Sequence, residues 1–597
     1  MSKISSQYIN NINWRINPKL LSDIANKIVE RSTDAVSNIK ANKFVSVMAD
    51  IATEYRIFNN VCIILKNLNN TNNTHYDNAI NILNKGTTYI KTNPNTIKYI
   101  NIKNQSNMDN LFNTVLIYKF GYGTNTNKQA TNYSDILDNI TQLENDLMEY
   151  YSKKLELIQT IKNIEDESKR KSVLKSCNKY KSNIDKLNKL LNYRHMYACS
   201  LGYTSYGSML DIQRIHNTDM TKAIFNRLLK LTENDYAKEI KTIANLKLNH
   251  INNDSVYMHD IEYYITFQQL QYGLDNNLIK EYFPISYVLP KILWIINKLF
   301  DVEINKTTIK SWNDEVEVYE LSENKIIIGY IYLDLYFRHG KNNTVEYYEI
   351  QPASIYNKSI QYPISCISAN FSKTELLVHS NLILLMKKFG KTIHNMYSRS
   401  RYSILNSSYK DYEELPEYIF EHLCWKKEIL KMLSKHHVSK EELPDDIIKK
   451  MLAIKDTGRA ILLRIELYHS MFDQLIHCDD YYHAIDKSDD KSTFILNASC
   501  VLREHVLPNI KSNSYTIDWI NISERGGWRY TSMLNDLYAR ELVATNAEIK
   551  PFFKITWMEN PIDLLQETTL FKPVGQYSLS KQISSKYKYD DIFIKKK

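Results

Sequence analysis

Apolar residues recur at intervals of three or four along most of the chain, which is the spacing of an amphipathic helix. The clearest such stretch runs over about residues 136–194, and a helix with one buried stripe is predicted over Ser380–Met396. Strand patterns are confined to the middle of the chain. There, Lys325–Tyr336 is rich in β-branched and aromatic residues and predicts two strands joined by a turn, with further strands over 316–321 and 364–371. The pattern therefore predicts a mainly α-helical protein with one small β-sheet around residues 316–371.

Composition narrows the class of protein further. The 597 residues include only 13 Gly and 12 Pro, too few turn residues for an all-β protein of this size. The net charge of +9 is small for this length, so nucleic acid is an unlikely partner. Seven scattered cysteines without a C-x-x-C pair favour a reducing, intracellular compartment. No apolar run approaches the ~20 residues that span a bilayer, and the first residues lack the apolar core of a secretion signal. We therefore expect a cytoplasmic protein that binds no membrane.

Several segments carry a resemblance to a known family, and they occur in the family's order. They are LGYTSY at 201–206, GYIYLDLYFRHGK at 329–341, ANFSK at 369–373, LLVH at 376–379 and DYEELPEYIFEHLCW at 411–425. Together they resemble the thimet oligopeptidase, neurolysin and oligopeptidase A family of zinc metallopeptidases, over about residues 145–570. The resemblance implies a zincin-like fold, a two-lobed helical ellipsoid with a deep channel and a small sheet beside the metal site. It also divides the chain into an N-terminal helical region, 1–145, and an oligopeptidase-like domain, 146–597.

The metal-binding motif of this family is degenerate in the present chain. The family carries H-E-F-G-H on a helix just after the segment like LLVH, and here residues 387–391 are K-K-F-G-K. The resemblance places Lys387 and Lys391 at the positions of the two zinc-binding histidines and Lys388 at that of the general-base glutamate. It places Glu414 at the position of the third zinc ligand.

These substitutions remove the chemistry that the family uses. Positions 387 and 391 share one helix face, the spacing at which two imidazoles converge on a zinc ion. A lysine ammonium has no lone pair to give to a metal, and Lys388 offers no carboxylate to take a proton from water. We therefore expect no metal, no zinc cofactor and no intact catalytic group. We also expect one or both of Lys387 and Lys391 to pair with Glu414.

Three further residues are candidates for a peptide-binding channel. His394 and Glu421 match a histidine and a glutamate of the family. Tyr530, within SERGGWRYTSMLNDL at 523–537, is the nearest counterpart of the tyrosines with which the family holds its substrate. An ordinary packed aromatic residue is an equally good interpretation of Tyr530.

The leading hypothesis from the sequence is a catalytically inactive oligopeptidase-like protein that binds a peptide or protein partner and is not an enzyme. The charge of the three lysines would favour acidic peptides or a C-terminal carboxylate. One alternative is an active metalloendopeptidase that cleaves short peptides through a rearranged metal site. Another is a scaffold protein that binds partners through its surface, using the lysine-rich segment 169–189 and the C-terminal lysines 595–597.

Overall fold

The computed structural model describes most of the chain. The described residues are 17–69, 74–100, 112–113, 116, 133–177, 181–356, 359–406, 409–485, 490–511, 522–523 and 526–555. Every helix in this part of the chain is too short or too polar to serve as a membrane span. The C-terminal lysines 595–597 lie outside the described residues.

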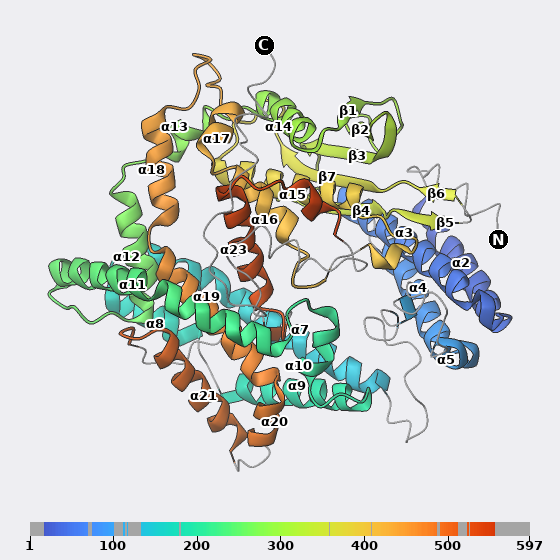
Figure 1. Cartoon of the computed structure of the whole chain (residues 1–597), viewed down its shortest axis with the longest axis horizontal. Coiled ribbons are helices and arrows are strands. Elements are labelled where there is room, and N and C mark those ends of the chain that lie inside the picture. The colour runs from blue at the N-terminus through green and yellow to red at the C-terminus, as the bar shows by residue number, and fades with distance from the viewer. Residues whose placement is uncertain are drawn as a thin grey trace.

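Helices dominate the structure, as predicted (Figure 1). In the first half of the chain they are α2 (Leu21–Ser37), α3 (Phe44–Asn69), α4 (Thr74–Thr92), α5 (Pro94–Ile100), α7 (Tyr133–Gln159), α8 (Glu167–Cys177), α9 (Lys181–Ser200), α10 (Tyr206–Leu210), α11 (Thr218–Ile251), α12 (Met258–Leu270), α13 (Asn276–Lys280) and α14 (Ile285–Phe300). After the sheet they are α15 (His379–Tyr397), α16 (Leu415–Leu423), α17 (Lys427–Leu433), α18 (Asp445–Asp456), α19 (Arg459–His477), α20 (Asp479–Ile485), α21 (Lys491–Val506) and α23 (Tyr530–Ala544). The helical stretch predicted over 136–194 is divided among α7, α8 and α9, and the expected boundary after residue 145 falls inside α7.

The strands form the one small sheet that the sequence predicts, together with a separate two-stranded ribbon. Their bounds are β1 (Glu303–Lys306), β2 (Glu317–Glu323), β3 (Ile326–Tyr336), β4 (Glu346–Gln351), β5 (Ser354–Tyr356), β6 (Ser359–Gln361) and β7 (Ile364–Phe371). The five-stranded sheet has the order β1-β2-β3-β7-β4, and β5 pairs with β6. β3 runs antiparallel to β2 and parallel to β7, while β4 pairs antiparallel with β7 and forms one edge.

The prediction of two strands and a turn over Lys325–Tyr336 is wrong, because β3 is a single strand of 11 residues. Glycine is common in turns, but Gly329 lies inside this strand. A Cβ at this position would approach the carbonyl oxygen of Pro363 to 2.8 Å. The glycine therefore allows a close approach of two backbones, which is the other common reason for glycine within a strand.

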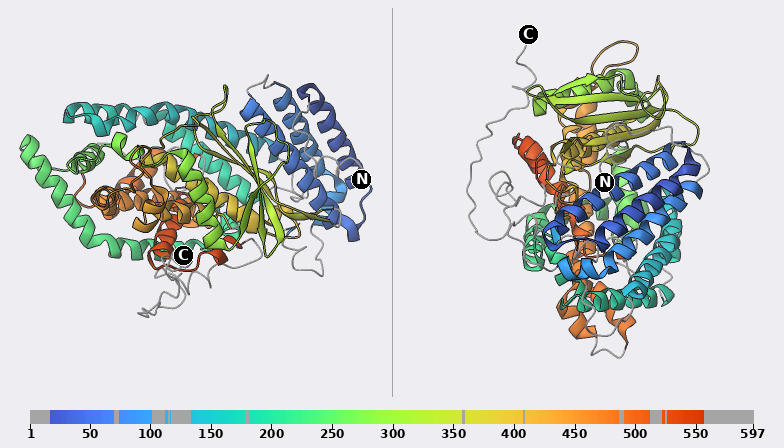
Figure 2. Two further views of the ribbon diagram at one scale, coloured as in Figure 1. Left: turned by 90° about the horizontal axis from the view of Figure 1, so that it is seen from above. Right: turned by 90° about the vertical axis from the view of Figure 1, so that its right-hand side faces the viewer.

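The sheet is buried on both faces, because successive side chains of a strand point to opposite sides. On β3, Ile331, Leu333 and Leu335 belong to the large core that includes α14 and α15. Tyr332, between them, belongs to a second core formed with the N-terminal helices α2, α3 and α4. Figure 2 shows these helices lying beside the sheet. The N-terminal region thus covers one face of the sheet, and α14 and α15 cover the other.

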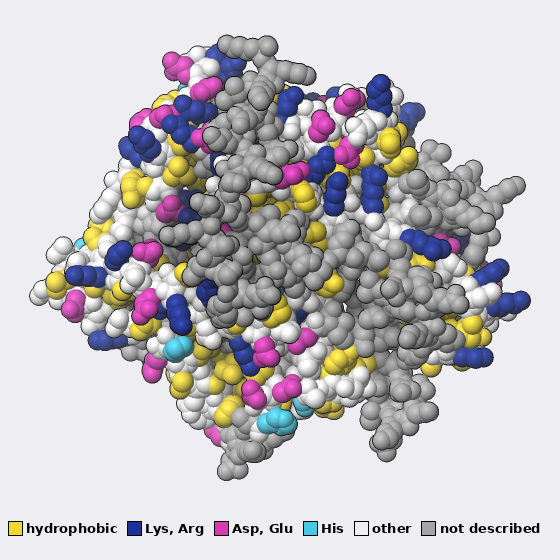
Figure 3. Space-filling view, viewed as in Figure 1, with side chains coloured by type: hydrophobic (Ala, Val, Ile, Leu, Met, Phe, Trp, Pro, Cys, Tyr) yellow, Lys and Arg dark blue, Asp and Glu magenta, His cyan; other side chains and the backbone are white. Residues whose placement is uncertain are grey.

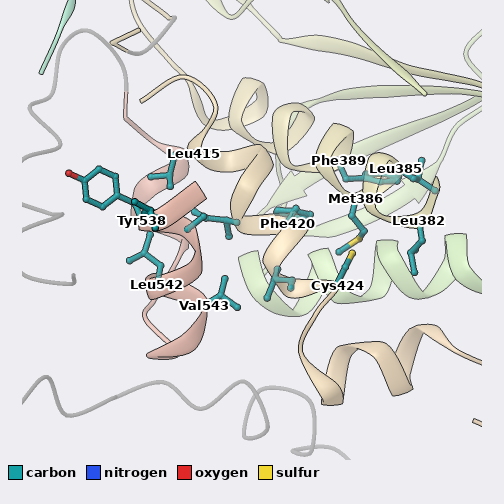
Figure 4. Close-up of a cluster of buried hydrophobic side chains, with 14 of the residues drawn as sticks. Leu382, Leu385, Met386, Phe389, Leu415, Phe420, Cys424, Tyr538, Leu542 and Val543 are labelled. Atoms are coloured by element: carbon teal, nitrogen blue, oxygen red, sulfur yellow. The ribbon is translucent and has the colours of Figure 1, made fainter. Parts of the chain in front are cut away.

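Helix α15 confirms the predicted helix over 380–396 almost to the residue. Its buried stripe packs against α16 and, through α16, against α23 (Figure 4). Leu382, Leu385, Met386 and Phe389 are all fully buried. Complete burial of side chains of this size contributes roughly 1.5–3 kcal/mol each, so this stripe is a major part of what positions α15.

A glycine sets the distance between α15 and α16. A Cβ at Gly390 would overlap the carbonyl oxygen of Pro416, in the first turn of α16. The two helices can therefore approach this closely only because position 390 carries no side chain.

We predict that Gly390→Val destabilises the protein by about 1–3 kcal/mol, because the added methyl groups must push α15 away from α16. Urea unfolding measures this change. The control is Ser380→Ala on the exposed first turn of the same helix, which should change the free energy of unfolding by less than about 0.5 kcal/mol. Equal stability of the two variants would contradict the close contact.

Candidate functional site

Lys387, Lys388 and Lys391 lie together on the side of α15 that faces α16. The two helices run antiparallel, and the glutamates that meet the lysines recur every four residues, on one face of the segment that includes α16. The contacts are Lys387 Nζ to Glu421 Oε2 at 2.8 Å, Lys388 Nζ to Glu417 Oε2 at 3.1 Å and Lys391 Nζ to Glu413 Oε1 at 3.5 Å. All six side chains are partly buried. We call these contacts the three α15–α16 ion pairs.

The first of these pairs has an additional contact. The Lys387 ammonium lies 4.0 Å from the centre of the Tyr418 ring, on the next turn of α16 from Glu421. A cation over an aromatic face is attracted by about 0.5–1 kcal/mol at partly exposed sites. Glu421, predicted as a channel residue, therefore holds Lys387 in place.

The expected pairing of Lys387 or Lys391 with Glu414 is wrong, since the structure gives these lysines other partners. Glu414 lies one residue away from the face that carries the paired glutamates, and its carboxylate accepts a hydrogen bond of 2.5 Å from the Ser532 hydroxyl on α23. Its immediate neighbour Glu413 takes the contact to Lys391 instead.

The zinc that the resemblance implies does not fit these residues. A protonated lysine has three donors and no lone pair, and a carboxylate that already neutralises an ammonium is a poor ligand for a dication. Each of Lys387, Lys388 and Lys391 holds one glutamate of the opposite segment. A metal at this position would have to displace three ammonium groups.

Two other clusters of the described residues combine histidine and carboxylate side chains closely enough for a metal, and in the first the carboxylates are already neutralised. It contains Glu167, His259 and Asp260. Lys247 Nζ lies 2.6 Å from both Glu167 Oε1 and Asp260 Oδ2, and Arg170 Nη2 lies 2.8 Å from Asp260 Oδ1. Two cations thus occupy the place that a metal would take.

The second cluster contains Glu281, His436 and His437. Nδ1 of His436 accepts hydrogen bonds from the backbone N–H groups of Val438 and Ser439, at 3.2 and 3.1 Å. The ring proton therefore sits on Nε2, which donates to Glu281 Oε2 at 3.0 Å. Because a metal needs a bare ring nitrogen, His436 in this arrangement serves as a hydrogen-bond donor and does not fit a ligand.

His394 lies one turn beyond Lys391 on α15 and is fully enclosed. Burial, and secondly the charge of Lys391, lower its pKa to about 4. Its Nδ1 lies 3.1 Å from the carbonyl oxygen of Phe553, and the Ser398 hydroxyl lies 3.2 Å from Nδ1 and 3.3 Å from Nε2. The imidazole is therefore neutral near pH 7, with Nδ1 as the donor.

Tyr530 lies away from this group, in the protein core. Its side chain is fully buried, and its hydroxyl donates to Asp411 Oδ2 over a long 3.4 Å. The Asp411 carboxylate, also buried, accepts backbone hydrogen bonds from Ile215 and His216 at 2.9–3.0 Å. The structure thus places Tyr530 beside a buried hydrogen-bond network, as the interpretation of an ordinary packed aromatic residue requires.

A polar cavity of about 270 Å³ lies beside the C-terminal half of α15. It extends from the third ion pair and His394 to the N-terminal helix α3 and the edge strand β4. Its lining residues are Arg56, Asn60, Tyr347, Glu349, Lys391, His394, Asn395, Ser398, Asn406 and Glu413. Of the predicted site residues, Lys391 and His394 line this cavity.

Most of these lining residues could not be predicted from the sequence. Arg56 and Asn60 belong to α3, in a region to which no role was assigned, and Tyr347 and Glu349 belong to β4. Glu413 alone had a signal, because it is next to Glu414 in the motif. Long-range contacts bring the others together, and no local pattern marks them.

The cavity wall holds a strong ion pair of its own. The Arg56 guanidinium contacts Glu349 at two points, with Nε 2.7 Å from Oε1 and Nη2 2.9 Å from Oε2. Its Nη1 donates to the carbonyl oxygen of Ser403 at 2.9 Å. This two-point geometry fixes α3 against β4.

The surface charge adds little to this picture. On the face shown in Figure 3, basic and acidic side chains of the described residues lie interspersed. This arrangement agrees with the small net charge of the chain.

We predict that His394 contributes to acid sensitivity. Its pKa is near 6.5 in the unfolded chain and about 4 in the folded protein. Between these two pH values the unfolded state binds a proton that the folded state does not bind. The free energy of unfolding therefore falls as the pH decreases through this window. Between pH 7 and pH 5 the wild type should lose about 2 kcal/mol more than His394→Gln in urea unfolding. His379, whose pKa is also lowered to about 4 by burial, is present in both proteins and cancels from the comparison. The same pH dependence in both proteins would refute this assignment.

Comparison with known proteins identifies the family. Residues 160–499, more than half of the chain, match the model of peptidase family M3. The chain is 28% identical to a thimet-like oligopeptidase of Dictyostelium discoideum over 341 residues, which cover 51% of this chain and 50% of that protein. It is 26% identical to oligopeptidase A of Escherichia coli over 306 residues, covering 49% and 45%. The chain thus spans about half the length of the curated relatives that it matches.

The fold is shared more widely than the sequence. A solved structure named as an oligoendopeptidase F has a TM-score of 0.51 at 12% identity and covers 92% of both chains. A peptidase from Chlamydophila abortus has a TM-score of 0.51 at 10% identity, covering 93% and 94%. The helical oligopeptidase-type fold predicted from the resemblance is confirmed.

These comparisons correct one prediction from the sequence. The chain was expected not to be an enzyme, but the family whose model it matches is a family of peptidases, and the relatives are named as peptidases. The lysines at 387, 388 and 391 were therefore given too much weight against the rest of the resemblance. With the match over residues 160–499, the chain belongs to peptidase family M3.

Proposed function

We propose that the protein is an oligopeptidase that takes short peptides into the cavity beside α15 and hydrolyses them. The match to peptidase family M3 carries this proposal, because it extends over eight of the ten residues that line the cavity. The relatives named as oligopeptidases support the substrate class.

The size and lining of the cavity suit a small polar ligand. A volume of about 270 Å³ corresponds to roughly nine water molecules, which is room for the end of a peptide and not for a folded chain. Charged and amide side chains on the wall can take over hydrogen bonds that a peptide loses on leaving water.

The proposal assigns no step to a metal, because the lysines of α15 do not fit one. Peptide hydrolysis needs a group that takes a proton from water, and carboxylates commonly serve in this role. Two carboxylates, Glu349 and Glu413, line the cavity. They are the groups through which the described residues can supply a base.

Turnover of internally quenched peptides of five to ten residues by the purified full-length chain tests the proposal. We expect cleavage of these peptides, and we expect it to fall at least about tenfold in Glu349→Gln, which removes one base candidate. Glu428→Gln, an exposed position on α17, is the matched control and should leave turnover unchanged.

Parallel assays after chelation, and after addition of zinc, cobalt or manganese, show whether a metal contributes. Absence of turnover in all of these conditions, with thermal unfolding showing a folded protein, would overturn the proposal. Unfolding curves of both variants separate a loss of catalysis from a loss of the fold.

A further inference from the structure

The charged residues that line the cavity are two cations and two carboxylates, and one further cation, Lys410, lies beside them. Arg56 and Glu349 satisfy each other through their two-point contact. The second carboxylate, Glu413, has two lysines beside it: Lys410 Nζ lies 2.7 Å from Oε2, and Lys391 Nζ lies 3.5 Å from Oε1. These described groups therefore comprise three cations and two carboxylates.

Of the two lysines beside Glu413, Lys391 makes the longer contact with its carboxylate. Its ammonium carries three donors, and its contact with Glu413 is longer than a normal charge-assisted hydrogen bond of about 2.7–2.9 Å. Lys410, in contrast, contacts the same carboxylate at 2.7 Å, and 48% of its side chain is exposed. The ammonium that faces the cavity is thus the one left with unused donors.

The polar side chains next to Lys391 make other contacts within the protein. His394 is neutral, its Nδ1 lies 3.1 Å from the carbonyl oxygen of Phe553, and the Ser398 hydroxyl lies 3.2 Å from Nδ1 and 3.3 Å from Nε2. The Asn395 amide donates to the Ser365 hydroxyl at 2.9 Å. The Asn406 amide donates to the carbonyl oxygen of Ala353. The Asn406 Oδ1 in turn accepts a hydrogen bond from the backbone N–H of Ser400 at 2.7 Å.

An anionic group that enters the cavity could therefore accept hydrogen bonds from the partly buried ammonium of Lys391. Side-chain exposure at Lys391 is 21%, so a bond formed there is screened less than one in open solvent. A peptide amine would gain less, because Arg56 and Lys410 already neutralise the two carboxylates of the wall.

We propose that Lys391 binds a carboxylate of a short peptide, either the free C-terminal carboxylate or an acidic side chain, when the peptide end enters the cavity. This inference rests on the peptide-binding part of the proposed function and is independent of hydrolysis. It gives the lysine at the former metal-ligand position a role in selecting substrates.

Calorimetric titration of the full-length chain at low salt tests this inference with three N-acetylated alanine tripeptides. The first has a free C-terminus, the second is amidated, and the third is amidated but carries a glutamate in place of one alanine. We expect the amidated neutral peptide to bind at least about tenfold more weakly than the free acid, the usual loss when a charge-assisted hydrogen bond is removed. The third peptide shows whether an acidic side chain can substitute for the terminus. Chromatography after each titration confirms that the peptide is intact.

Variants locate the effect at the proposed residue. Lys391→Gln should abolish the preference for the free acid, and Lys391→Arg should keep it, because the positive charge remains. Lys388→Gln is the matched control: it removes a lysine three residues away that pairs with Glu417 outside the cavity lining, and it should leave all affinities unchanged. Thermal unfolding confirms that each variant is folded.

The outcomes separate this inference from the proposed function. Equal affinity of the wild type for all three peptides, or an unchanged preference in Lys391→Gln, would overturn the role of Lys391 even if peptides are cleaved. Binding that depends on the carboxylate, without any turnover, would overturn hydrolysis and leave the inference standing.

Discussion

The close antiparallel contact between α15 and α16 is the constraint on which the candidate site depends. It requires a position without a side chain at Gly390, because the carbonyl oxygen of Pro416 lies where a Cβ would be. The buried stripe of α15 belongs to one hydrophobic core with residues of α16 and of the sheet, and this core holds the helix in place (Figure 4). At this short distance the lysine and glutamate side chains of the two segments meet directly. The three α15–α16 ion pairs are therefore a consequence of the backbone geometry.

The helical part of the fold could be predicted from the sequence because its signals are local. The periodicity of Leu382, Leu385, Met386 and Phe389 gave the bounds of α15 within one residue at each end. The turn predicted within Lys325–Tyr336 is absent because the strand continues through Gly329, whose backbone lies close to Pro363, a residue far along the chain. A pattern read along the chain carries no information about such an approach.

The candidate site was predictable only in part, for the same physical reason. The family motif identified the three lysines, and helical spacing placed Lys387 and Lys391 on one face of α15. Their partners were misassigned, because a shift of one residue along α16 exchanges Glu414 for Glu413, and no sequence pattern fixes the rotation of one helix against another. The contribution of Arg56 could not be foreseen, since 293 residues separate it from Glu349. The activity class was also misjudged, because one degenerate motif was set above the similarity of several hundred residues.

The sheet explains how the N-terminal helices reach the site. Because β3 buries alternate side chains on its two faces, one layer of helices must cover each face. The α2–α4 layer brings Arg56 to the end of β4, where the cavity begins. Residues outside the segment that the family model matches thus form part of the wall of the cavity.

The three α15–α16 ion pairs have one more consequence, for how this part of the molecule tolerates change. A bound ion is a single shared cross-link, and removing one ligand weakens every connection that passes through it. Three separate pairs are modular: each one can be lost or rebuilt by mutation while the other two still connect the segments. The connection between α15 and the segment that includes α16 can therefore change by one pair at a time.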